Sequence, residues 1–333
     1  MFDISVIIPC RNEEATIHKL LDSLFNQTIS PDEYEIIIAD GLSDDSTLDN
    51  IAKFKNNHPE INISVVENSR QNIPAGLNCA INNSSGKYII RLDAHSIPSN
   101  DYLERCVTLL KNGIAENVGG VWIINPSSDT LTAKAIAIAA SHPLGVGGAN
   151  YRIASSKSGY VDTVPFGAFL RSTLDKVGLY DETLLSNEDY ELNARIIKSG
   201  GRIFLDSSIH CAYFSRENYK KLAKQYWRYG FWKFKMLLRY PDTIRVRQAL
   251  PPVFLLSLAV LFITSIINYR FFLFFIGEII IYIVALFLGT HNSIRSTEKP
   301  FKMWRLTVFS ILTMHFSWGL GFLYSAINSL FNL

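Results

Sequence analysis

An aspartate and a histidine, Asp93 and His95, stand two residues apart where a predicted strand gives way to a loop. The strand is the apolar, β-branched run 88–92, interrupted only by Arg91, and Pro98 marks the loop that follows. A carboxylate oxygen and an imidazole nitrogen at this spacing can share one divalent cation, with Mn²⁺ favoured over Mg²⁺. Taken alone the motif is weak, because a surface turn with two polar residues has the same sequence.

The composition indicates a soluble part followed by a membrane part. The 333 residues carry a formal net charge of +2, so no global basic field points to nucleic acid. Residues up to about 215 alternate polar and apolar, whereas residues from 250 onward are mostly apolar. The four cysteines show no C-x-x-C spacing and fit a reducing cytosol, and the N-terminus lacks the features of a signal peptide.

The first hundred residues alternate between predicted strands and helices. Strands are expected at 4–9, 34–39, 61–67 and 88–92, and helices at 17–25, 47–56 and 73–83. This order is typical of an α/β fold in which a parallel sheet carries helices on both faces. Another short strand is expected at 160–164, and a helix is expected after Asp189.

Three predicted strands deliver polar residues to one edge of this sheet, the edge at which open α/β sheets bind ligands. The polar clusters are 11–13 (Arg-Asn-Glu), 40–45, which contains Asp40, Asp44 and Asp45, and 93–95 (Asp-Ala-His). Neither a dinucleotide-binding G-x-G-x-x-G after the first strand nor a P-loop motif is present. A phosphate-bearing ligand is therefore expected to be held by a metal and by side chains, not by a glycine loop.

Six ordered motifs stand between residues 6 and 192. They are 6–13, 39–46 (Ala-Asp-Gly-Leu-Ser-Asp-Asp-Ser), 76–80 (Gly-Leu-Asn-Cys-Ala), 91–95 (Arg-Leu-Asp-Ala-His), 165–169 (Pro-Phe-Gly-Ala-Phe) and 188–192 (Glu-Asp-Tyr-Glu-Leu). Together they resemble the family 2 glycosyltransferases, over about residues 3–235. That family has the nucleotide-sugar-binding GT-A fold, a Rossmann-like mixed sheet with flanking helices. The Asp-Ala-His variant is most similar to the bacterial succinoglycan-type branch, which builds exopolysaccharide units on a lipid carrier.

The resemblance implies a nucleotide-sugar site at the sheet edge. Its residues are Pro9, Arg11, Glu13, Asp40, Asp44, Asn78, Arg91 and Asp93. Asp40 is implied to accept a hydrogen bond from uracil. Asp93 and His95 are implied to replace the usual Asp-x-Asp motif, which binds the ribose and the metal that bridges the diphosphate. Because His95 supplies no negative charge, we expect weaker metal binding and a preference for Mn²⁺.

Two adjacent carboxylates, Glu188 and Asp189, precede a predicted helix for which Ser186 or Asn187 is a candidate N-cap. One interpretation is that they only complement the helix dipole. The resemblance instead implies that Asp189 is the general base. It would remove the proton of an acceptor hydroxyl as that oxygen attacks the anomeric carbon opposite the leaving diphosphate, with inversion. Glu188 would then support it or bind the acceptor.

The acceptor side is less well marked. Small residues around Phe166 and Gly167 would allow a sugar ring to approach the backbone. The glycine-rich stretch 145–149 is either an acceptor-side loop or a turn. Gln225, Arg228 and Tyr229 resemble the Gln-x-x-Arg-Trp element of processive family members, but tyrosine replaces tryptophan, so processivity is not implied.

The last third of the chain is expected to associate with a membrane. We divide the chain into a GT-A domain at 1–215, an amphipathic interfacial region at 216–248 and a membrane domain at 249–333. Basic residues alternate with aromatic ones at 219–240, which suits an anionic leaflet better than nucleic acid given the apolar runs that follow. Those runs, at 250–268, 271–289 and 306–330, are each long enough to span a hydrocarbon core of ~30 Å.

Basic residues precede the first run and separate the second from the third, whereas only Arg270 lies between the first two. By the positive-inside rule this predicts a multi-pass protein of the inner membrane with a cytoplasmic catalytic domain and an external C-terminus. Glu278, inside the second run, is expected to contact a neighbouring helix, and the alternative is a contact with a lipid headgroup or the acceptor.

The prediction that follows is an inverting, metal-dependent glycosyltransferase. It would move a hexose from a nucleotide sugar, UDP-linked by resemblance, to a lipid-linked saccharide in cell-surface or exopolysaccharide biosynthesis. One alternative is a polyprenyl-phosphate sugar transferase of the same fold. An inactive nucleotide-binding membrane module is disfavoured because Asp40, Asp93 and Asp189 are all present. A nucleotidyltransferase is disfavoured because the first loop lacks its glycines and lysine.

Overall fold

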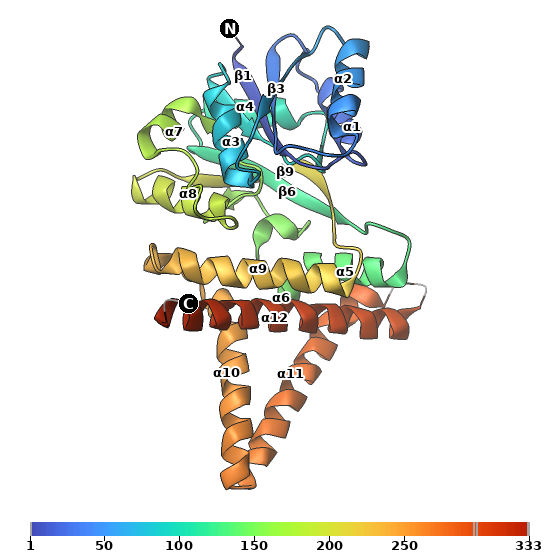
Figure 1. Ribbon diagram of the computed structural model, residues 1–333. Coiled ribbons are helices and arrows are strands. Elements are labelled where there is room, and N and C mark those ends of the chain that lie inside the picture. Colours follow the sequence, from blue (N-terminus) through green and yellow to red (C-terminus); the bar gives the residue numbers. More distant parts are fainter. Residues whose placement is uncertain (1, 296, 298, 332–333) are drawn as a thin grey trace. The chain divides into compact units, whose positions relative to one another are not determined.

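The computed structural model describes residues 2–295, 297 and 299–331, and the chain divides into two compact units (Figure 1). The first unit comprises Met1–Ile123 and Ala154–Tyr213, and the second comprises Ile124–Ile153 and Phe214–Leu333. The second unit thus includes residues 124–153 in addition to the C-terminal region that the sequence sets apart. The reason is the helix at 131–141, which is apolar on most sides and must be covered by other helices.

The first unit is built on a mixed sheet with the strand order β3-β2-β1-β4-β8-β6-β9-β5. Strands β1 (Ile4–Cys10), β2 (Tyr34–Asp40), β3 (Asn62–Glu67) and β4 (Tyr88–Arg91) pair in parallel, as the sequence predicts. Antiparallel neighbours extend the sheet: β8 (Ala168–Leu170) lies between β4 and β6 (Asn117–Asn125), and β5 (Ile97–Pro98) pairs with β9 (Ile203–Phe214). The mixed α/β sheet expected for a GT-A fold is therefore present.

The helices of the first unit are α1 (Ile17–Phe25), α2 (Thr47–Asn57), α3 (Ile73–Asn82), α4 (Tyr102–Lys111), α7 (Arg171–Val177) and α8 (Glu188–Lys198). The predicted strand at 160–164 is wrong beyond its first residue. Strand β7 contains only Gly159–Tyr160, which pair with β9. The chain then runs as a loop in which Phe166 adopts a left-handed conformation (φ 48°), which no strand residue can have.

The register of the parallel strands fixes the position of the candidate site. Cys10 at the end of β1 pairs with Asp40 at the end of β2, and Ile7 pairs with Arg91 at the end of β4. Strands β1, β2 and β4 are buried along nearly their whole length, so apolar packing holds them in place. Their carboxyl ends consequently lie together at one edge of the sheet.

The second unit is helical. Its elements are α5 (Leu131–Ser141), α6 (Pro143–Val146), the short helix η1 (Asn150–Arg152), α9 (Tyr219–Leu237), η2 (Pro241–Thr243), α10 (Val246–Ile267), α11 (Arg270–Ile294) and α12 (Pro300–Leu330). Residues of α5, α9, α11 and α12, among them Ile136, Leu222, Leu286 and Ile311, form one hydrophobic core. The stretch 145–149 is not an open loop, because it contains the end of α6 and a left-handed turn at Gly147.

Three helices of this unit, α10, α11 and α12, are long and apolar enough to cross a membrane. They differ in burial: 39% of the most apolar window of α12 is covered by protein, against 6% for α10 and for α11. Helices α10 and α11 form a hairpin, whereas α12 runs beside α9 (Figure 1). Inside the hairpin the Ser257 hydroxyl donates to Glu278 Oε1 (2.5 Å), so Glu278 makes the expected contact with a neighbouring helix.

Candidate active site

The loops after β1 and β2 are tied together by a reciprocal pair of hydrogen bonds. Asn12 Nδ2 donates to Asp44 Oδ1 (2.7 Å), and the Asp44 backbone N–H donates to Asn12 Oδ1 (3.1 Å). Asn12 has a left-handed backbone (φ 54°), which asparagine tolerates better than most residues. The two hydrogen bonds fix the loop that carries the exposed Arg11, and Asp44 is itself one of the two bonded residues.

The carboxylate of Asp40 is buried and fixed at the end of β2. Its Oδ2 accepts from the Ser43 backbone N–H (3.0 Å) and its Oδ1 from the Ser43 hydroxyl (2.6 Å). A carboxylate has about four acceptor sites, so Asp40 retains the capacity to accept from a ligand. Pro9, on the neighbouring strand opposite Ala39, lies against Gly76 of α3, where a Cβ atom would meet the proline ring at 3.3 Å.

Arg91 is the electrostatic centre of the site. Its guanidinium is 3% exposed, and it donates to Asp93 Oδ1 (3.1 Å) and to Glu188 Oε1 (3.1 Å). It also makes a close ion pair with Asp189 Oδ1. A buried guanidinium needs such partners, because transferring an unpaired charge out of water is costly. One cation therefore brings together residues that the sequence predicts separately: Asp93 after β4, and the acidic pair at the start of α8.

The environment raises the pKa of the Asp189 carboxyl to about 7. Burial is the main cause, because it disfavours the charged form. Arg91 opposes this effect, whereas the negative charges of Glu188 and Asp93 add to it. Helix-dipole stabilisation alone would lower the pKa of a carboxyl in the first turn. Asp189 thus has the proton affinity of a general base working near neutral pH.

His95 is held by Glu13. Its Nδ1 lies 3.0 Å from Glu13 Oε1, while Glu13 Oε2 accepts from the Thr16 hydroxyl (2.6 Å). Donation of an Nδ1 proton to the carboxylate would fix the tautomer of the ring, with Nε2 as the acceptor nitrogen. Metal-binding histidines are usually oriented by a carboxylate in this way. Glu13, which the sequence places at the nucleotide, is thus the partner of the predicted metal ligand.

The described residues do not by themselves form a complete metal site. Across residues 2–295, 297 and 299–331, no group of three or more His, Cys, Asp or Glu side chains is positioned to hold a metal ion. Asp93 and His95 supply one oxygen and one nitrogen. This donor set fits a Mn²⁺ or Mg²⁺ ion that takes its remaining ligands from water and from substrate phosphates.

Asn78 has partners inside the protein. Its Nδ2 donates to the Tyr180 carbonyl (2.9 Å) and to Glu182 Oε1 (2.9 Å), and its Oδ1 accepts from the Tyr180 backbone N–H (2.9 Å). These bonds pin the segment before α8 to α3. Asn78 thereby positions the acidic pair, and its predicted contact with the sugar stays a prediction.

Phe166 and Gly167 lie just before β8. The Phe166 ring is buried against Trp122, with 5.2 Å between ring centroids. A Cβ atom at Gly167 would come within 2.5 Å of Asn117 Oδ1, so internal packing requires glycine here. Their predicted contact with an acceptor stays a prediction.

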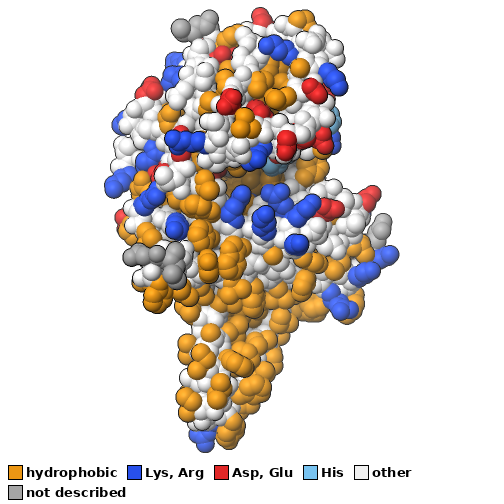
Figure 2. Space-filling model, in the orientation of Figure 1, with side chains coloured by type: hydrophobic (Ala, Val, Ile, Leu, Met, Phe, Trp, Pro, Cys, Tyr) orange, Lys and Arg blue, Asp and Glu red, His pale blue; other side chains and the backbone are white. Residues whose placement is uncertain are grey.

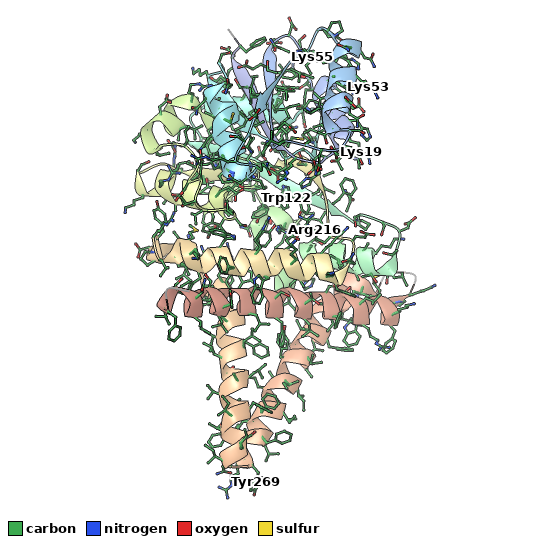
Figure 3. The ribbon with its side chains drawn as sticks, viewed as in Figure 1. Lys19, Lys53, Lys55, Trp122, Arg216 and Tyr269 are labelled. Atoms are coloured by element: carbon green, nitrogen blue, oxygen red, sulfur yellow. The ribbon has the colours of Figure 1, made fainter. Side chains whose placement is uncertain are left out.

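An aromatic row that the sequence does not reveal lies beside His95. Trp122 of β6, labelled in Figure 3, stacks on Tyr213 of β9 with ring centroids 4.2 Å apart, and Tyr213 lies 6.3 Å from the His95 ring. No motif marks these residues, because only the sheet order brings β6 and β9 together. Both rings are buried, so the row belongs to the core that packs beside the predicted metal ligand.

Gln225, Arg228 and Tyr229 belong to α9 of the second unit. Gln225 Nε2 donates to the Tyr229 hydroxyl (2.9 Å), one helical turn away, and Arg228 is exposed. Their predicted role in binding the acceptor stays a prediction.

The mixed sheet with its acidic edge belongs to the class of nucleotide-sugar-binding GT-A folds. The model of the family described as "Glycosyl transferase family 2" matches residues 5–178, and the chain belongs to this family. The resemblance noted in the sequence is thereby confirmed.

Two relatives cover most of the chain. The dolichyl N-acetyl-alpha-D-glucosaminyl phosphate 3-beta-D-2,3-diacetamido-2,3-dideoxy-beta-D-glucuronosyltransferase of Methanococcus voltae is 31% identical over 304 residues, which are 89% of this chain and 89% of that protein. The succinoglycan biosynthesis protein ExoA of Rhizobium meliloti is 30% identical over 250 residues, 74% of this chain and 73% of ExoA. The similarity to the succinoglycan-type branch is thus confirmed as well.

Two solved structures show the same fold. The mannosyltransferase PcManGT from Pyrobaculum calidifontis, in complex with GDP-Man and Mn²⁺, matches with a TM-score of 0.62 and 17% identity over 99% of this chain and 87% of its own. Residues 1–349 of TarS from S. aureus, in complex with UDP-GlcNAc, match with a TM-score of 0.53 and 15% identity over 98% and 92%. At these identities the likeness concerns the fold alone.

Replacing Arg91 by methionine should destabilise the first unit by about 3–5 kcal/mol near neutral pH, because three carboxylates lose their common cation. The loss should shrink as the pH falls through about 7, the pKa of Asp189, since the protonated Asp189 carboxyl no longer needs the cation. The measurement is the apparent Tm in detergent at pH 8 and at pH 5.5.

Arg171→Met is the matched control. Arg171 donates to the backbone carbonyls of Gly86 and Ser84, which do not titrate, so its loss should lower the Tm equally at both pH values. If the loss of Tm for Arg91→Met were also the same at both pH values, Arg91 would not be stabilised by ion pairs with the three carboxylates.

Proposed function

We propose that the chain is an inverting glycosyltransferase that moves a hexose from a nucleotide sugar, UDP-linked, to a lipid-linked saccharide. The observation that carries the proposal is the Arg91 cluster, in which a carboxyl with a pKa of about 7 shares a cation with Asp93 at the ligand-binding edge of the sheet. The Methanococcus voltae relative, named for transfer to a dolichyl-linked sugar phosphate, supports a lipid-linked acceptor.

In this reaction Asp189 accepts the proton of the acceptor hydroxyl. The hydroxyl oxygen forms a bond to the anomeric carbon from the face opposite the diphosphate. The bond from that carbon to the diphosphate oxygen breaks with its electron pair, so the nucleoside diphosphate leaves and the configuration inverts. Arg91 keeps the Asp189 carboxylate in one orientation, and a base with a pKa near the working pH is both ionised and basic enough to act.

The donor is assigned to the strand edge. Asp40 accepts from the uracil ring, and Arg11 lies beside the nucleotide. Asp93 and His95 would hold a Mn²⁺ or Mg²⁺ ion. When bound, such an ion offsets the negative charge that develops on the leaving diphosphate.

The membrane holds the enzyme near its acceptor. Helix α9 is rich in lysine and aromatic residues, which suits the anionic cytoplasmic leaflet of an inner membrane, and α10 and α11 anchor the chain in the bilayer. We assign acceptor binding to Gln225, Arg228 and Tyr229 on α9, and to Phe166 and Gly167 in the catalytic unit. Glu188 supports the base.

The test of this function is a donor screen on the full chain in detergent. Release of nucleoside diphosphate is followed from a panel of UDP- and GDP-sugars, with Mn²⁺ or EDTA, and with or without a membrane lipid extract. We expect release from a UDP-sugar that requires both metal and lipid. Nucleotide binding without release from any donor would favour the inactive module. A product in which one sugar is joined directly to a lipid phosphate would favour the polyprenyl-phosphate transferase.

The pH dependence of the transfer rate should reflect the ionisation of the Asp189 carboxyl. Transfer should rise with pH through about 7 and level off above it, because only the ionised carboxylate accepts a proton. Glu188→Gln removes a charge that raises the pKa of Asp189, so the rise should move to lower pH. Asp189→Asn should lower kcat by a factor of about 10²–10⁴ and leave nucleotide affinity intact.

Glu182→Gln is the control for this profile, since Glu182 bonds Asn78 and Arg70 outside the cluster and should leave the profile in place. Full activity of Asp189→Asn would remove Asp189 from the role of base.

Glu13 should set the metal affinity through His95. We expect Glu13→Ala to weaken Mn²⁺-dependent UDP binding by about 10–100-fold, because the imidazole loses its orienting carboxylate. Glu13→Gln, which keeps an acceptor oxygen, should show a smaller loss. The measurement is a Mn²⁺ titration of UDP binding by calorimetry.

The neighbouring carboxylate provides the control. Glu14 accepts from the Ser46 backbone N–H, so Glu14→Ala should leave the Mn²⁺ dependence unchanged. Equal Mn²⁺ affinity of Glu13→Ala and the unaltered chain would show that His95 does not need Glu13, or does not bind the ion.

A further inference from the structure

Helix α12 runs beside α9 in the same direction. Near its start, Phe309 of α12 contacts Tyr219 of α9, with ring centroids 4.7 Å apart. Nearer its end, Phe322 contacts Phe234 at 5.2 Å. Figure 1 shows the two helices side by side within the second unit.

The two helices touch backbone to backbone. A Cβ atom at Gly230 of α9 would lie 1.9 Å from the Trp318 carbonyl oxygen, and one at Gly321 of α12 would lie 2.3 Å from the Trp227 carbonyl oxygen. Such reciprocal glycine contacts leave no room for lipid between the helices. Whatever depth α9 occupies in a membrane, α12 must therefore occupy nearly the same depth.

Helix α9 cannot enter the hydrocarbon core. Its basic residues are Lys220, Lys221, Lys224, Arg228, Lys233 and Lys235. Four of them, the first three lysines and the arginine, are exposed. Charged side chains are strongly disfavoured in hydrocarbon, and an amphipathic basic helix lies in the plane of the membrane surface. A helix joined to α9 along its length lies in that plane as well.

The contacts of α12 with the hairpin agree with this orientation. A Cβ atom at Gly319 would meet the Pro251 carbonyl, near the start of α10, at 3.0 Å. On the other arm the Tyr282 hydroxyl lies 2.7 Å from His315 Nδ1, and Phe287 contacts Trp304 with centroids 4.6 Å apart. These contacts lie at the first turns of α10 and in the second half of α11. Helix α12 thus crosses the base of the hairpin (Figure 1).

The outer part of the hairpin extends away from this crossing. Ile266 and Ile267 are 77% and 84% exposed, and Tyr269 lies at the tip (Figure 3). Figure 2 shows hydrophobic side chains covering the visible face of the hairpin. Helix α10 has 22 residues, and its part from Pro251, where α12 crosses, to Ile267 is about 24 Å long by the helical rise. The polar and amphipathic side chains of residues 268–270 (Asn-Tyr-Arg) at the tip would extend the hairpin to the far interface of a locally thinned hydrocarbon core.

Helix α12 also has an apolar face that the described residues leave exposed. Its exposed members are Phe309, Phe316, Leu320, Tyr324 and Ile327. They follow one another at intervals of seven, four, four and three residues, which places them on one side of the helix. An apolar stripe of this kind, beside a basic helix and continuous with a membrane hairpin, fits the acyl chains at the bilayer surface.

We propose that α12 lies in the membrane interface, and that α10 and α11 alone cross the bilayer. The C-terminus is then on the same side as the catalytic unit. This differs from the expectation of a third span at 306–330 with an external C-terminus. The basic residues before α10 and between α11 and α12 remain on one side, as the positive-inside rule requires. The inference does not depend on the sugar or on the acceptor.

The test is cysteine labelling in sealed vesicles of both orientations. Single cysteines replace Lys302 and Asn328 near the two ends of α12, Asn268 at the tip of the hairpin, and Lys55 on α2 as a marker of the catalytic side. A membrane-impermeant maleimide is added, and the labelled peptides are identified by mass, which separates them from the native cysteines.

We expect Lys302→Cys and Asn328→Cys to be labelled from the same side as Lys55→Cys, and Asn268→Cys from the opposite side. Labelling of Asn328→Cys from the side of Asn268→Cys would overturn the proposal, because α12 would then cross the membrane. Labelling of Asn268→Cys from the side of Lys302→Cys would overturn the two crossings.

A second measurement needs no substitution. An epitope tag after the C-terminus of the otherwise unchanged chain should be digested by protease in inverted vesicles and protected in right-side-out vesicles. The reverse pattern would place the C-terminus outside and refute the proposal.

Discussion

The ion cluster around Arg91 is the interaction on which the catalytic unit depends. A guanidinium with 3% exposure is tolerated only with anionic partners, and here the partners come from the loop after β4 and from the start of α8. The same cluster that satisfies this buried charge crowds three carboxylates together. Burial, and after it the repulsion by the neighbouring carboxylates, raises the pKa of Asp189, so folding and base strength have one physical origin.

In the second unit the governing constraint is the close approach of α9 and α12. Gly230 and Gly321 allow backbone contact between a helix rich in lysine and a helix rich in leucine and phenylalanine. Neither helix alone determines its position, because α9 favours water and α12 favours lipid. Joined, they fit the boundary between the two, where each exposes its own side to the medium it prefers.

The sequence predicts well whatever depends on local periodicity. In the parallel strands the apolar run stops where the strand stops. The residue pattern by itself therefore places Asp40, Arg91 and Asp93 at the correct edge of the sheet. It does not predict pairings that depend on sheet order, as for Trp122 and Tyr213, or on which helices cover residues 131–141. The strand expected at 160–164 fails after Tyr160, because the alternating residues of this segment (Tyr-Val-Asp-Thr-Val) have the pattern of a strand although the segment forms a loop. Hydropathy likewise does not distinguish a helix that crosses a bilayer from one that lies on it.

The Asp-Ala-His variant illustrates how one departure from a family pattern requires another residue to act. A second aspartate in place of His95 would add negative charge two residues from Asp93, which already shares the buried Arg91 cation with Glu188 and Asp189. Histidine adds no such charge, but a neutral imidazole must be oriented before it can serve as a ligand. The Glu13 carboxylate provides that orientation from the loop after β1, at 3.0 Å from Nδ1. Glu13 is therefore best understood together with His95.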